Sequence, residues 1–344
     1  MALEKDNILE VMDLKTYFFS KEERVPAVDG VSFSVRPGEI LGLIGESGCG
    51  KSVTAQSILR IVPSPGRIVG GSILYHRIDA GHEDVVDLTR MDPKGDKIRS
   101  IRWKEIAMIF QEPMVSFGPL HTIGNQIAEA IQIHSPFIRT SEARNMVVKL
   151  LMDVGVPRPE KLVDAYPHQF SGGMLQRAMI AMALSCSPRL LIADEATTYL
   201  DVTIQAQILE LLKELHEKKR MSILLITHNL AVVAQLAERV VVMYLGKIVE
   251  SATMQTVFRD PLHPYTKGLW RSIPRVDGEL SPLVPIPGSV GSHREELKGC
   301  VFAPRCEVVM PTICHVGGDP PTVEVAPGHF VSCHHYPKPQ SAGD

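Results

Sequence analysis

The segment from Gly45 to Ser52 reads Gly-Glu-Ser-Gly-Cys-Gly-Lys-Ser and fits the pattern G-x-x-x-x-G-K-[ST]. It follows an apolar stretch predicted to be a strand, Ile40 to Ile44, and opens an amphipathic stretch predicted to be a helix, Ser52 to Ile61. Closely spaced glycines let successive backbone N–H groups point at one anion, and the helix N-terminus adds favourable partial charge. Lys51 would reach the β- and γ-phosphates of a nucleotide, and Ser52 would bind Mg²⁺. A glycine-rich structural turn is the alternative interpretation.

Composition places the chain among ordinary globular proteins. Of its 344 residues, 44% are hydrophobic and 22% are charged, which excludes disorder as the main state. The formal net charge of −3 lacks the basic excess of nucleic-acid binders, so no nucleic-acid partner is expected. No apolar run reaches the ~18 residues that a bilayer span needs, and the segment from Met1 to Lys15 has no apolar signal core. We therefore expect the protein to remain in the cytoplasm.

Four apolar segments have the character of buried strands, and segments with helical spacing separate them. Strands are predicted at 40–44, 106–110, 190–193 and 222–226; helices are predicted at 52–61, over most of 122–186 with breaks near 156–159 and at 167, and along 204–215. This alternation predicts an α/β fold with a mainly parallel sheet covered on both faces. Short early strands, and a hairpin formed by 240–243 and 248–250, predict an added antiparallel layer. From about residue 260, prolines and glycines dominate.

Polar side chains that follow these strands are candidate site residues. Asp194 and Glu195 end the apolar run that begins at Leu190, and parallel α/β sheets bind ligands at that end of their strands. Successive strand residues point in opposite directions, so Asp194 suits a Mg²⁺ site while Glu195 suits a general base that activates water. Two solvated acids at a strand end are the alternative. Gln111 and His228 follow two other strands, and His228 would lie near the γ-phosphate, although a lone histidine is more often structural.

The segment from Phe170 to Arg177, Phe-Ser-Gly-Gly-Met-Leu-Gln-Arg, resembles the signature loop of ABC ATPases, usually written L-S-G-G-Q. It lies between the phosphate loop and the Asp-Glu strand, which is the order in that family. Gln111 then corresponds to the Q-loop, Asp201 to the D-loop aspartate and His228 to the switch histidine. The resemblance covers roughly residues 8–255, and its specificity comes from the order of the motifs. Taken alone, the serine and two glycines would be an ordinary helix cap.

This resemblance implies a fold, a reaction and a set of site residues. The fold is a P-loop NTPase of the ABC ATPase type: a RecA-like parallel core, an antiparallel β layer and a helical subdomain at about 112–186. The reaction is hydrolysis of ATP with Mg²⁺, in a head-to-tail dimer that holds each ATP between one subunit's phosphate loop and the other's signature. The catalytic residues carried over are Lys51, Gln111, Glu195 and His228, and the Mg²⁺ ligands are Ser52, Gln111 and Asp194. The ATP-binding residues carried over are Phe18, Gly45, Glu46, Ser47, Gly48, Cys49, Gly50, Lys51, Ser52, Val53, Gln111, Ser171, Gly172, Gly173, Asp194 and Asp201.

Phe18 is the aromatic residue that the resemblance places on the adenine ring, and its neighbour Tyr17 is the alternative. Three positions depart from the family pattern. Ala196 stands in place of the usual proline, Tyr199 in place of a small residue, and Phe117 with Gly118 in place of Leu-Asn. None of these removes a predicted phosphate or metal contact. Tyr199 adds bulk beside the D-loop at the expected dimer interface, and neutral drift is the alternative explanation.

A narrower resemblance is to the ATPases of oligopeptide and dipeptide importers. It is carried by Met174 in the signature and by the segments 176–184, 201–207, 261–266 and 299–306. It implies an ABC ATPase domain over 1–258 and an importer-type C-terminal extension over 259–344. The function implied is ATP-driven uptake of di- and oligopeptides at the cytoplasmic face of the cell membrane. The implied partners are a second ATPase subunit, two transmembrane permease subunits and an extracytoplasmic solute-binding protein. A paralogue is the expected second ATPase, and a copy of this chain is the alternative. Uptake of nickel or another small solute, and a soluble ABC ATPase outside transport, are the alternatives.

Four of the six cysteines lie in this extension with the spacing C-x5-C-x7-C-x18-C; they are Cys300, Cys306, Cys314 and Cys333. In a cytosolic protein, clustered cysteines indicate a metal site more than disulfides. Some members of the resembling subfamily carry a [4Fe–4S] cluster here, and we predict that occupant. Zinc and free, buried thiols are the alternatives. His315, His334 and His335 are substitute ligands if one cysteine does not bind.

Overall fold

The computed structural model describes residues 7–20, 23–79, 82–198, 200–272, 285–288 and 298–336. The chain divides into two compact units. The first unit comprises Met1–Leu9, Val35–Glu39 and Leu74–Ile226; the second comprises Glu10–Ser34, Ile40–Ile73 and Thr227–Asp344. None of the helices in the described ranges is long and apolar enough to cross a membrane.

A parallel sheet forms the core of the first unit. Its strands are β6 (Ile106–Ile109), β7 (Leu190–Asp194) and β8 (Ser222–Thr227), and β7 pairs in parallel with both neighbours. Every residue of the three strands is buried, which explains why their sequences are continuous apolar runs rather than alternating ones. The predicted parallel pairing of these segments is therefore confirmed. β4 (Gly66–Asp79) continues into this unit and pairs antiparallel with β5 (His82–Asp87).

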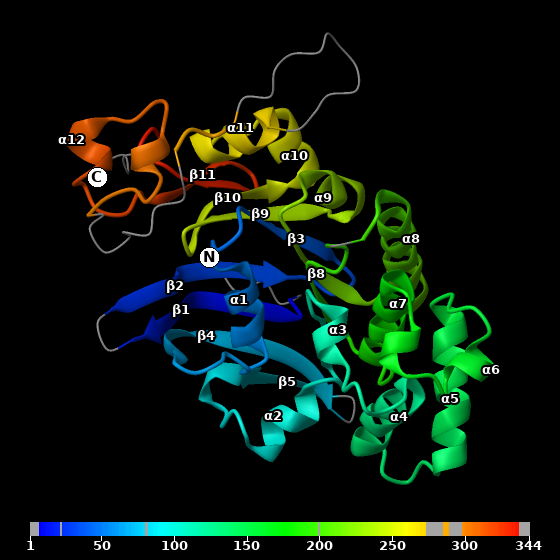
Figure 1. Ribbon diagram of the computed structural model, residues 1–344. Helices are drawn as coiled ribbons and strands as arrows, with labels where there is room; N and C mark the ends of the chain where they lie inside the picture. Colours follow the sequence, from blue (N-terminus) through cyan, green and yellow to red (C-terminus); the bar gives the residue numbers. More distant parts are fainter. Residues whose placement is uncertain are drawn as a thin grey trace. The chain divides into compact units, whose positions relative to one another are not determined.

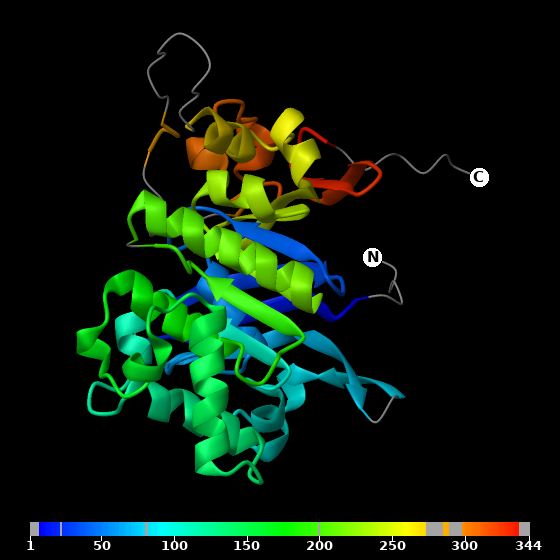
Figure 2. The same cartoon turned by 90° about the vertical axis from the view of Figure 1, so that its right-hand side faces the viewer.

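Helices fill most of the region predicted to be helical. The helices within the predicted segments are α4 (Ile123–His134), α5 (Thr140–Asp153), α6 (Pro159–Leu162), α7 (Gly172–Ala183) and α8 (Val202–Lys219). Two short helices, α2 (Asp96–Ile101) and α3 (Pro113–Ser116), lie outside the segments predicted to be helical. Residues spaced four apart form the buried stripe of α4, namely Ile123, Ile127 and Ile131. Helices α4, α5, α6 and α7 pack on one another as a group within this unit (Figures 1 and 2). The predicted breaks are also present, because α6 starts at Pro159 and a short 3₁₀ turn starts at Pro167.

The second unit contains β1 (Leu9–Phe19), β2 (Arg24–Val35), β3 (Ile40–Ile44), α1 (Lys51–Ile58), α9 (Leu230–Leu236), β9 (Arg239–Tyr244) and β10 (Lys247–Thr253). β3 pairs in parallel with β9, and β9 turns back into β10 as an antiparallel hairpin. The turn consists of Leu245 and Gly246, both with positive φ, as the tight hairpin turn that matches strand twist requires. The predicted late hairpin is confirmed.

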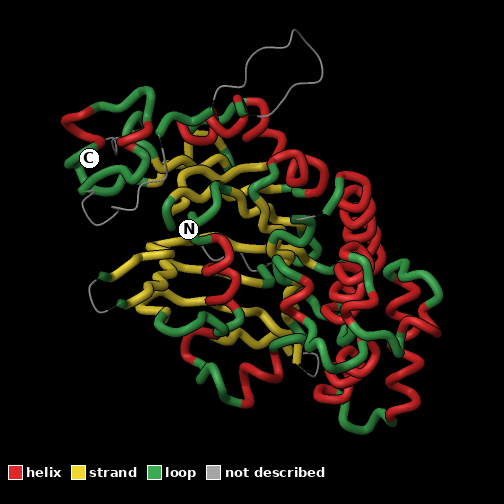
Figure 3. The backbone as a smooth tube through the Cα atoms, viewed as in Figure 1, coloured by secondary structure: helices red, strands yellow, loops and turns green. Residues whose placement is uncertain are grey.

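The part of the chain after residue 253 adds further elements to this unit. They are α10 (Met254–Arg259), α11 (Pro264–Arg271), α12 (Pro311–Cys314), β11 (Thr322–Ala326) and β12 (His329–Ser332). β12 extends the sheet by pairing with β10, and β11 pairs with β12 (Figure 3). The sequence predicted neither the β11–β12 hairpin nor helix α11, because each of these elements is too short to show a clear hydrophobic period.

A buried carboxylate joins these late elements to the sheet. Glu250, in β10, is 1% exposed. Its two oxygens accept hydrogen bonds of 2.8 Å from the backbone N–H groups of Leu262 and His263, and Nε2 of His329 lies 2.8 Å from Oε1. One side chain thus connects β10 with the turn before α11 and with β12. A buried carboxylate is tolerated because each of its partners is a donor.

We expect Glu250→Ala to destabilise the protein by about 3 kcal/mol, because it leaves two backbone N–H groups and one imidazole buried without their acceptor. The free energy of unfolding from denaturant titration measures this. Glu324→Ala is the matched control, because Glu324 is exposed on β11 and accepts a hydrogen bond from the backbone N–H of Gly328 in the same hairpin. Equal stability of the two variants would contradict the role of Glu250.

Candidate functional site

The phosphate loop lies between β3 and α1, as predicted, and its backbone needs glycine. Gly45, Gly48 and Gly50 have φ of 154°, 78° and 102°. A Cβ atom at Gly45 would lie 2.2 Å from the carbonyl oxygen of Met243, and one at Gly50 would lie 2.2 Å from that of Ala27. At Gly45 and Gly50, both the positive φ and the close approach of neighbouring main chain exclude a side chain. At Gly48 the positive φ alone favours glycine.

The side chain of Lys51 folds back over this loop. Its Nζ donates to the carbonyl oxygens of Gly45 at 2.8 Å and Glu46 at 2.9 Å, and it lies 3.7 Å from Sγ of Cys49. Lys51 is 4% exposed. Burial raises the pKa of the Cys49 thiol, which suits a side chain that fills the loop rather than one that reacts. Ser52 and Val53 are half-buried in the first turn of α1.

Elements outside the loop hold its first residues in place. The backbone N–H of Glu46 donates to the hydroxyl of Tyr265 at 2.8 Å. The carboxylate of Glu46 pairs with Arg305, with Nη1 2.7 Å from Oε2 and Nη2 3.1 Å from Oε1. Tyr265 and Arg305 lie in the C-terminal segments 261–266 and 299–306. From these segments the sequence predicted only that the chain resembles a subfamily. Sequence reasoning missed their contact with the loop, because 259 residues separate Glu46 from Arg305.

In the first unit, Gln111 and Glu195 come together. Nε2 of Gln111 donates to Oε2 of Glu195 at 2.9 Å, and the hydroxyl of Thr198 donates to the same oxygen at 3.1 Å. Glu195 directly follows β7, is 8% exposed and has a φ of 48°, in the left-handed region. Such a backbone conformation is costly for a residue other than glycine and is often found at functional sites. Asp194, the last residue of β7, is 3% exposed.

The predicted signature and D-loop residues are helix caps in the same unit. Ser171 precedes α7, and its hydroxyl accepts from the N–H of Met174 at 3.3 Å. Ser171 and Gly172 are exposed, and the space around Gly172 is open to 4 Å. Asp201 caps α8 by accepting from the N–H groups of Thr203 and Ile204. The N-termini of both helices therefore lie at or close to the surface of their unit.

Two further candidates lie in the second unit. His228 follows β8 and is exposed. Phe18, near the end of β1, is half-buried, whereas Tyr17 is 6% exposed. The hydroxyl of Tyr17 donates to Asp29 at 2.7 Å, and the Arg24 guanidinium lies 4.3 Å from the centre of its ring. Phe18 therefore has more ring surface free for a ligand than Tyr17.

Of the positions that depart from the family pattern, Ala196 and Phe117 are buried, while Tyr199 lies outside the described residues.

The four cysteines of the extension lie in the second unit, near enough to influence one another's charge. Cys300, Cys314 and Cys333 are buried and Cys306 is half-buried. Burial raises the pKa of Cys300 to about 11, with smaller contributions from the other three thiols. The backbone N–H of Cys300 donates to the carbonyl of Cys314 at 2.8 Å. Within the described ranges, however, no three His, Cys, Asp or Glu side chains are arranged to hold a metal ion, so the predicted metal centre is not supported.

Two family models match the chain. Residues 28–198 match the model "ABC transporter", and residues 249–314 match "Oligopeptide/dipeptide transporter, C-terminal region". Among curated proteins, the chain is similar to the oligopeptide transport ATP-binding protein AppD of Bacillus subtilis, with 52% identity over 88% of this chain and 89% of that protein. It is also similar to the dipeptide transport ATP-binding protein DppD of Haemophilus influenzae, with 45% identity over 90% and 93%.

Among solved structures, the chain is similar to the ATP-binding cassette MJ0796, determined as a dimer in a post-hydrolysis state bound to ADP and Pi. The TM-score is 0.61 at 23% identity, over 72% of this chain and 98% of that one. This likeness confirms the predicted fold of an ABC ATPase. The identities with curated relatives extend over nearly the whole chain, and they agree with the order of motifs described above. The chain is an ABC-type transport ATPase and belongs to the family of oligopeptide/dipeptide transport ATP-binding proteins.

Proposed function

We propose that this protein hydrolyses ATP to drive the import of di- and oligopeptides across the cell membrane. The observation that carries the cargo class is the 52% identity with an oligopeptide transport ATP-binding protein. The match of residues 249–314 to the C-terminal region of such transporters supports the same class. Closure of a dimer upon ATP binding, and its reopening after hydrolysis, would drive the transport of the peptide across the membrane. We also propose that the ATPase domain ends near residue 258 and that the C-terminal extension begins there.

Glu195 is the proposed general base. Its carboxylate is positioned by Gln111 and Thr198, and it is 8% exposed. A carboxylate fixed by two hydrogen-bond donors is preorganised to accept a proton from an attacking water. Gln111 holds this base in place, and His228 is the proposed contact to the γ-phosphate. Phe18 is the proposed contact to adenine, and its greater exposure compared with Tyr17 supports this assignment.

The backbone of the phosphate loop is the proposed cradle for the phosphates, with Lys51 as its cation. A phosphate group would compete for the Lys51 donors that the carbonyls of Gly45 and Glu46 now accept. Ser52 and Asp194 carry hydroxyl and carboxylate oxygens, the ligand types that Mg²⁺ prefers, and Gln111 adds an amide oxygen. When bound, Mg²⁺ would neutralise charge on the phosphates.

Glu195→Gln should keep ATP binding but reduce the hydrolysis rate by about 100-fold or more, because loss of a general base typically costs that much. The measurement is phosphate release at saturating ATP in the purified transporter complex, with ATP affinity measured in parallel. Glu210→Gln, an exposed change on α8, is the matched control. Hydrolysis near the wild-type rate in Glu195→Gln would rule out the general-base role.

A head-to-tail dimer is the proposed assembly, with a paralogous ATPase as the second subunit. The exposed Ser171 and Gly172 at the start of the 12-residue helix α7 support it, because a helix N-terminus open to the surface is free to meet phosphate from a partner. Two permease subunits and an extracytoplasmic solute-binding protein complete the proposed transporter. This assembly places the chain at the cytoplasmic face of the membrane.

Mild purification of the tagged chain from its membrane should recover two permease subunits and a second, different ATPase. Reconstituted with the matching solute-binding protein, the complex should hydrolyse ATP faster when di- or oligopeptides are added. Stimulation by nickel ions and not by peptides would reject the peptide class while keeping the ATPase. Recovery of the chain without any membrane subunit would contradict the transport function.

A [4Fe–4S] cluster on the four extension cysteines is proposed from the chemistry of the residues and the subfamily resemblance. The clustering of four reduced thiols in one segment supports it. The arrangement of those thiols in the described residues does not itself form a metal site, since no three His, Cys, Asp or Glu side chains there make a ligand set. No step of the ATPase reaction depends on this group.

Anaerobic purification should yield about four iron and four sulfide per chain if the cluster is present. Cys333→Ser should lose this iron, whereas Cys186→Ser, a half-buried cysteine outside the extension, should retain it. A colourless wild-type protein without iron would reject the cluster. Stoichiometric zinc in that protein would identify the alternative occupant.

A further inference from the structure

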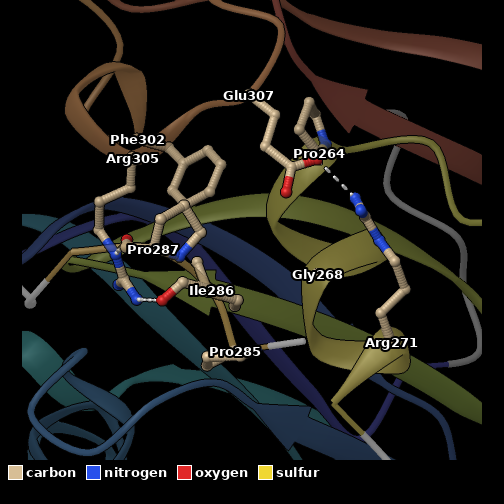
Figure 4. A pocket seen from close by; sticks show the side chains of 9 residues that line it. All are labelled: Pro264, Gly268, Arg271, Pro285, Ile286, Pro287, Phe302, Arg305 and Glu307. Atoms are coloured by element: carbon tan, nitrogen blue, oxygen red, sulfur yellow. Dashed lines mark hydrogen bonds and ion pairs between the residues drawn. The ribbon is translucent and has the colours of Figure 1, made fainter. Parts of the chain in front are cut away.

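Each N–H donor of the buried Arg305 side chain has an acceptor. A guanidinium has five N–H donors. Nε donates to the carbonyl of Pro287 at 2.9 Å, and Nη2 reaches the carbonyl of Ile286 at 3.5 Å (Figure 4). Nη1 reaches the hydroxyl of Tyr244 at 3.4 Å, and the two remaining donors go to the two oxygens of Glu46. The Arg305 side chain is 6% exposed, and its hydrogen bonds to Glu46 and, to a lesser degree, Tyr244 raise its pKa above the ordinary value.

Aromatic rings fix the direction from which Arg305 and Tyr265 approach the phosphate loop. The ring of Tyr244 packs against Tyr265 at 4.7 Å between centroids and against Phe302 at 5.1 Å. Tyr265 and Phe302 are 5.4 Å apart. All three rings are at most 3% exposed. The hydroxyl of Tyr265 and the guanidinium of Arg305 thus extend from a rigid apolar cluster, and both reach the same loop residue.

Glu46 is therefore held at its main chain and at its side chain by the C-terminal part of the protein. We propose that Arg305 and Tyr265 are positioning residues of the ATP site, so that the extension beyond residue 259 forms part of the machinery that binds nucleotide. This inference rests on the proposed ATP binding of the loop. Neither residue touches phosphate in this scheme; both act through Glu46.

Two physical effects favour this role. The first is geometric, because the carbonyl of Glu46 is one of the two that accept from Lys51, so a shift of Glu46 also shifts the lysine. The second is electrostatic. Glu46 places a negative charge inside a loop built to attract anions, and without a partner this charge would oppose ATP phosphates. The bidentate Arg305 pair neutralises the carboxylate and holds it in one orientation.

The test measures the affinity of the purified full-length chain for ATP by titration with a fluorescent ATP analogue and competition with ATP. We expect Arg305→Gln to raise the Kd about 10-fold, the size of one charge-assisted interaction. Arg305→Lys keeps the charge but loses the fork, so its Kd should rise by about 3-fold, and Tyr265→Phe should give a similar rise. In the assembled complex, the KM for ATP should rise while kcat changes by less than about twofold.

A double variant distinguishes the positioning role of Arg305 from general damage to the fold. In Glu46→Gln/Arg305→Gln, the unpaired carboxylate is gone, and ATP affinity should return to within about 3-fold of wild type. Arg271→Gln is the matched control, because Arg271 pairs with Glu307 at 2.9 Å in the same region but is about half exposed (Figure 4). The Kd of the Arg271→Gln variant for ATP should equal that of the wild-type protein.

The inference is overturned if the Arg305 and Tyr265 variants bind ATP as wild type does. It is also overturned if the loss caused by Arg305→Gln is the same with and without Glu46→Gln. If Arg305→Gln fails to fold, Arg305→Lys and Tyr265→Phe decide the question. Failure of wild type itself to bind ATP would instead overturn the proposed function, so the two failures are distinguishable.

Discussion

The backbone of the phosphate loop is the constraint to which much of the second unit is adapted. Gly45 and Gly50 leave no room for a side chain, since the carbonyls of Met243 and Ala27 would lie 2.2 Å from any Cβ atom there. The same close approach allows Gly246, at the β9–β10 turn, to donate its N–H to the carbonyl of Cys49 at 2.7 Å. The loop is thus supported from outside at the carbonyl of Cys49 and at the backbone N–H and the carboxylate of Glu46.

The C-terminal extension packs on the rest of this unit through buried aromatic rings and through buried polar contacts. Glu250 ties β12 and the turn before α11 to β10, and Arg305 ties the cysteine-bearing segment to Glu46. Both are charged groups whose burial is tolerated only because their hydrogen bonds are satisfied. Burial also lowers the pKa of His263 to about 3, so this imidazole stays neutral and accepts from the N–H of Tyr265 at 3.1 Å. These contacts order a segment rich in proline and glycine that has few long apolar stretches.

Much of the fold could be predicted because its signals are local. The runs at Ile40 and Leu190 are entirely apolar because strands covered on both faces bury every residue, and the helix breaks coincide with Pro159 and Pro167. Strand ends were placed less well, since the predicted strand through Phe110 ends at Ile109. The β11–β12 hairpin was missed because its strands have five and four residues and owe their order to pairing with β10.

By itself, the sequence determined the phosphate loop, the order of the ATPase motifs and the family, because each depends on residue type and spacing along the chain. Only the tertiary structure decided which of these residues meet. It placed the amide of Gln111 on the carboxylate of Glu195 across 84 positions, and Arg305 on Glu46 across 259. Hydrogen bonds between distant segments depend on how strands and loops are brought together, and spacing along the chain carries no record of that arrangement.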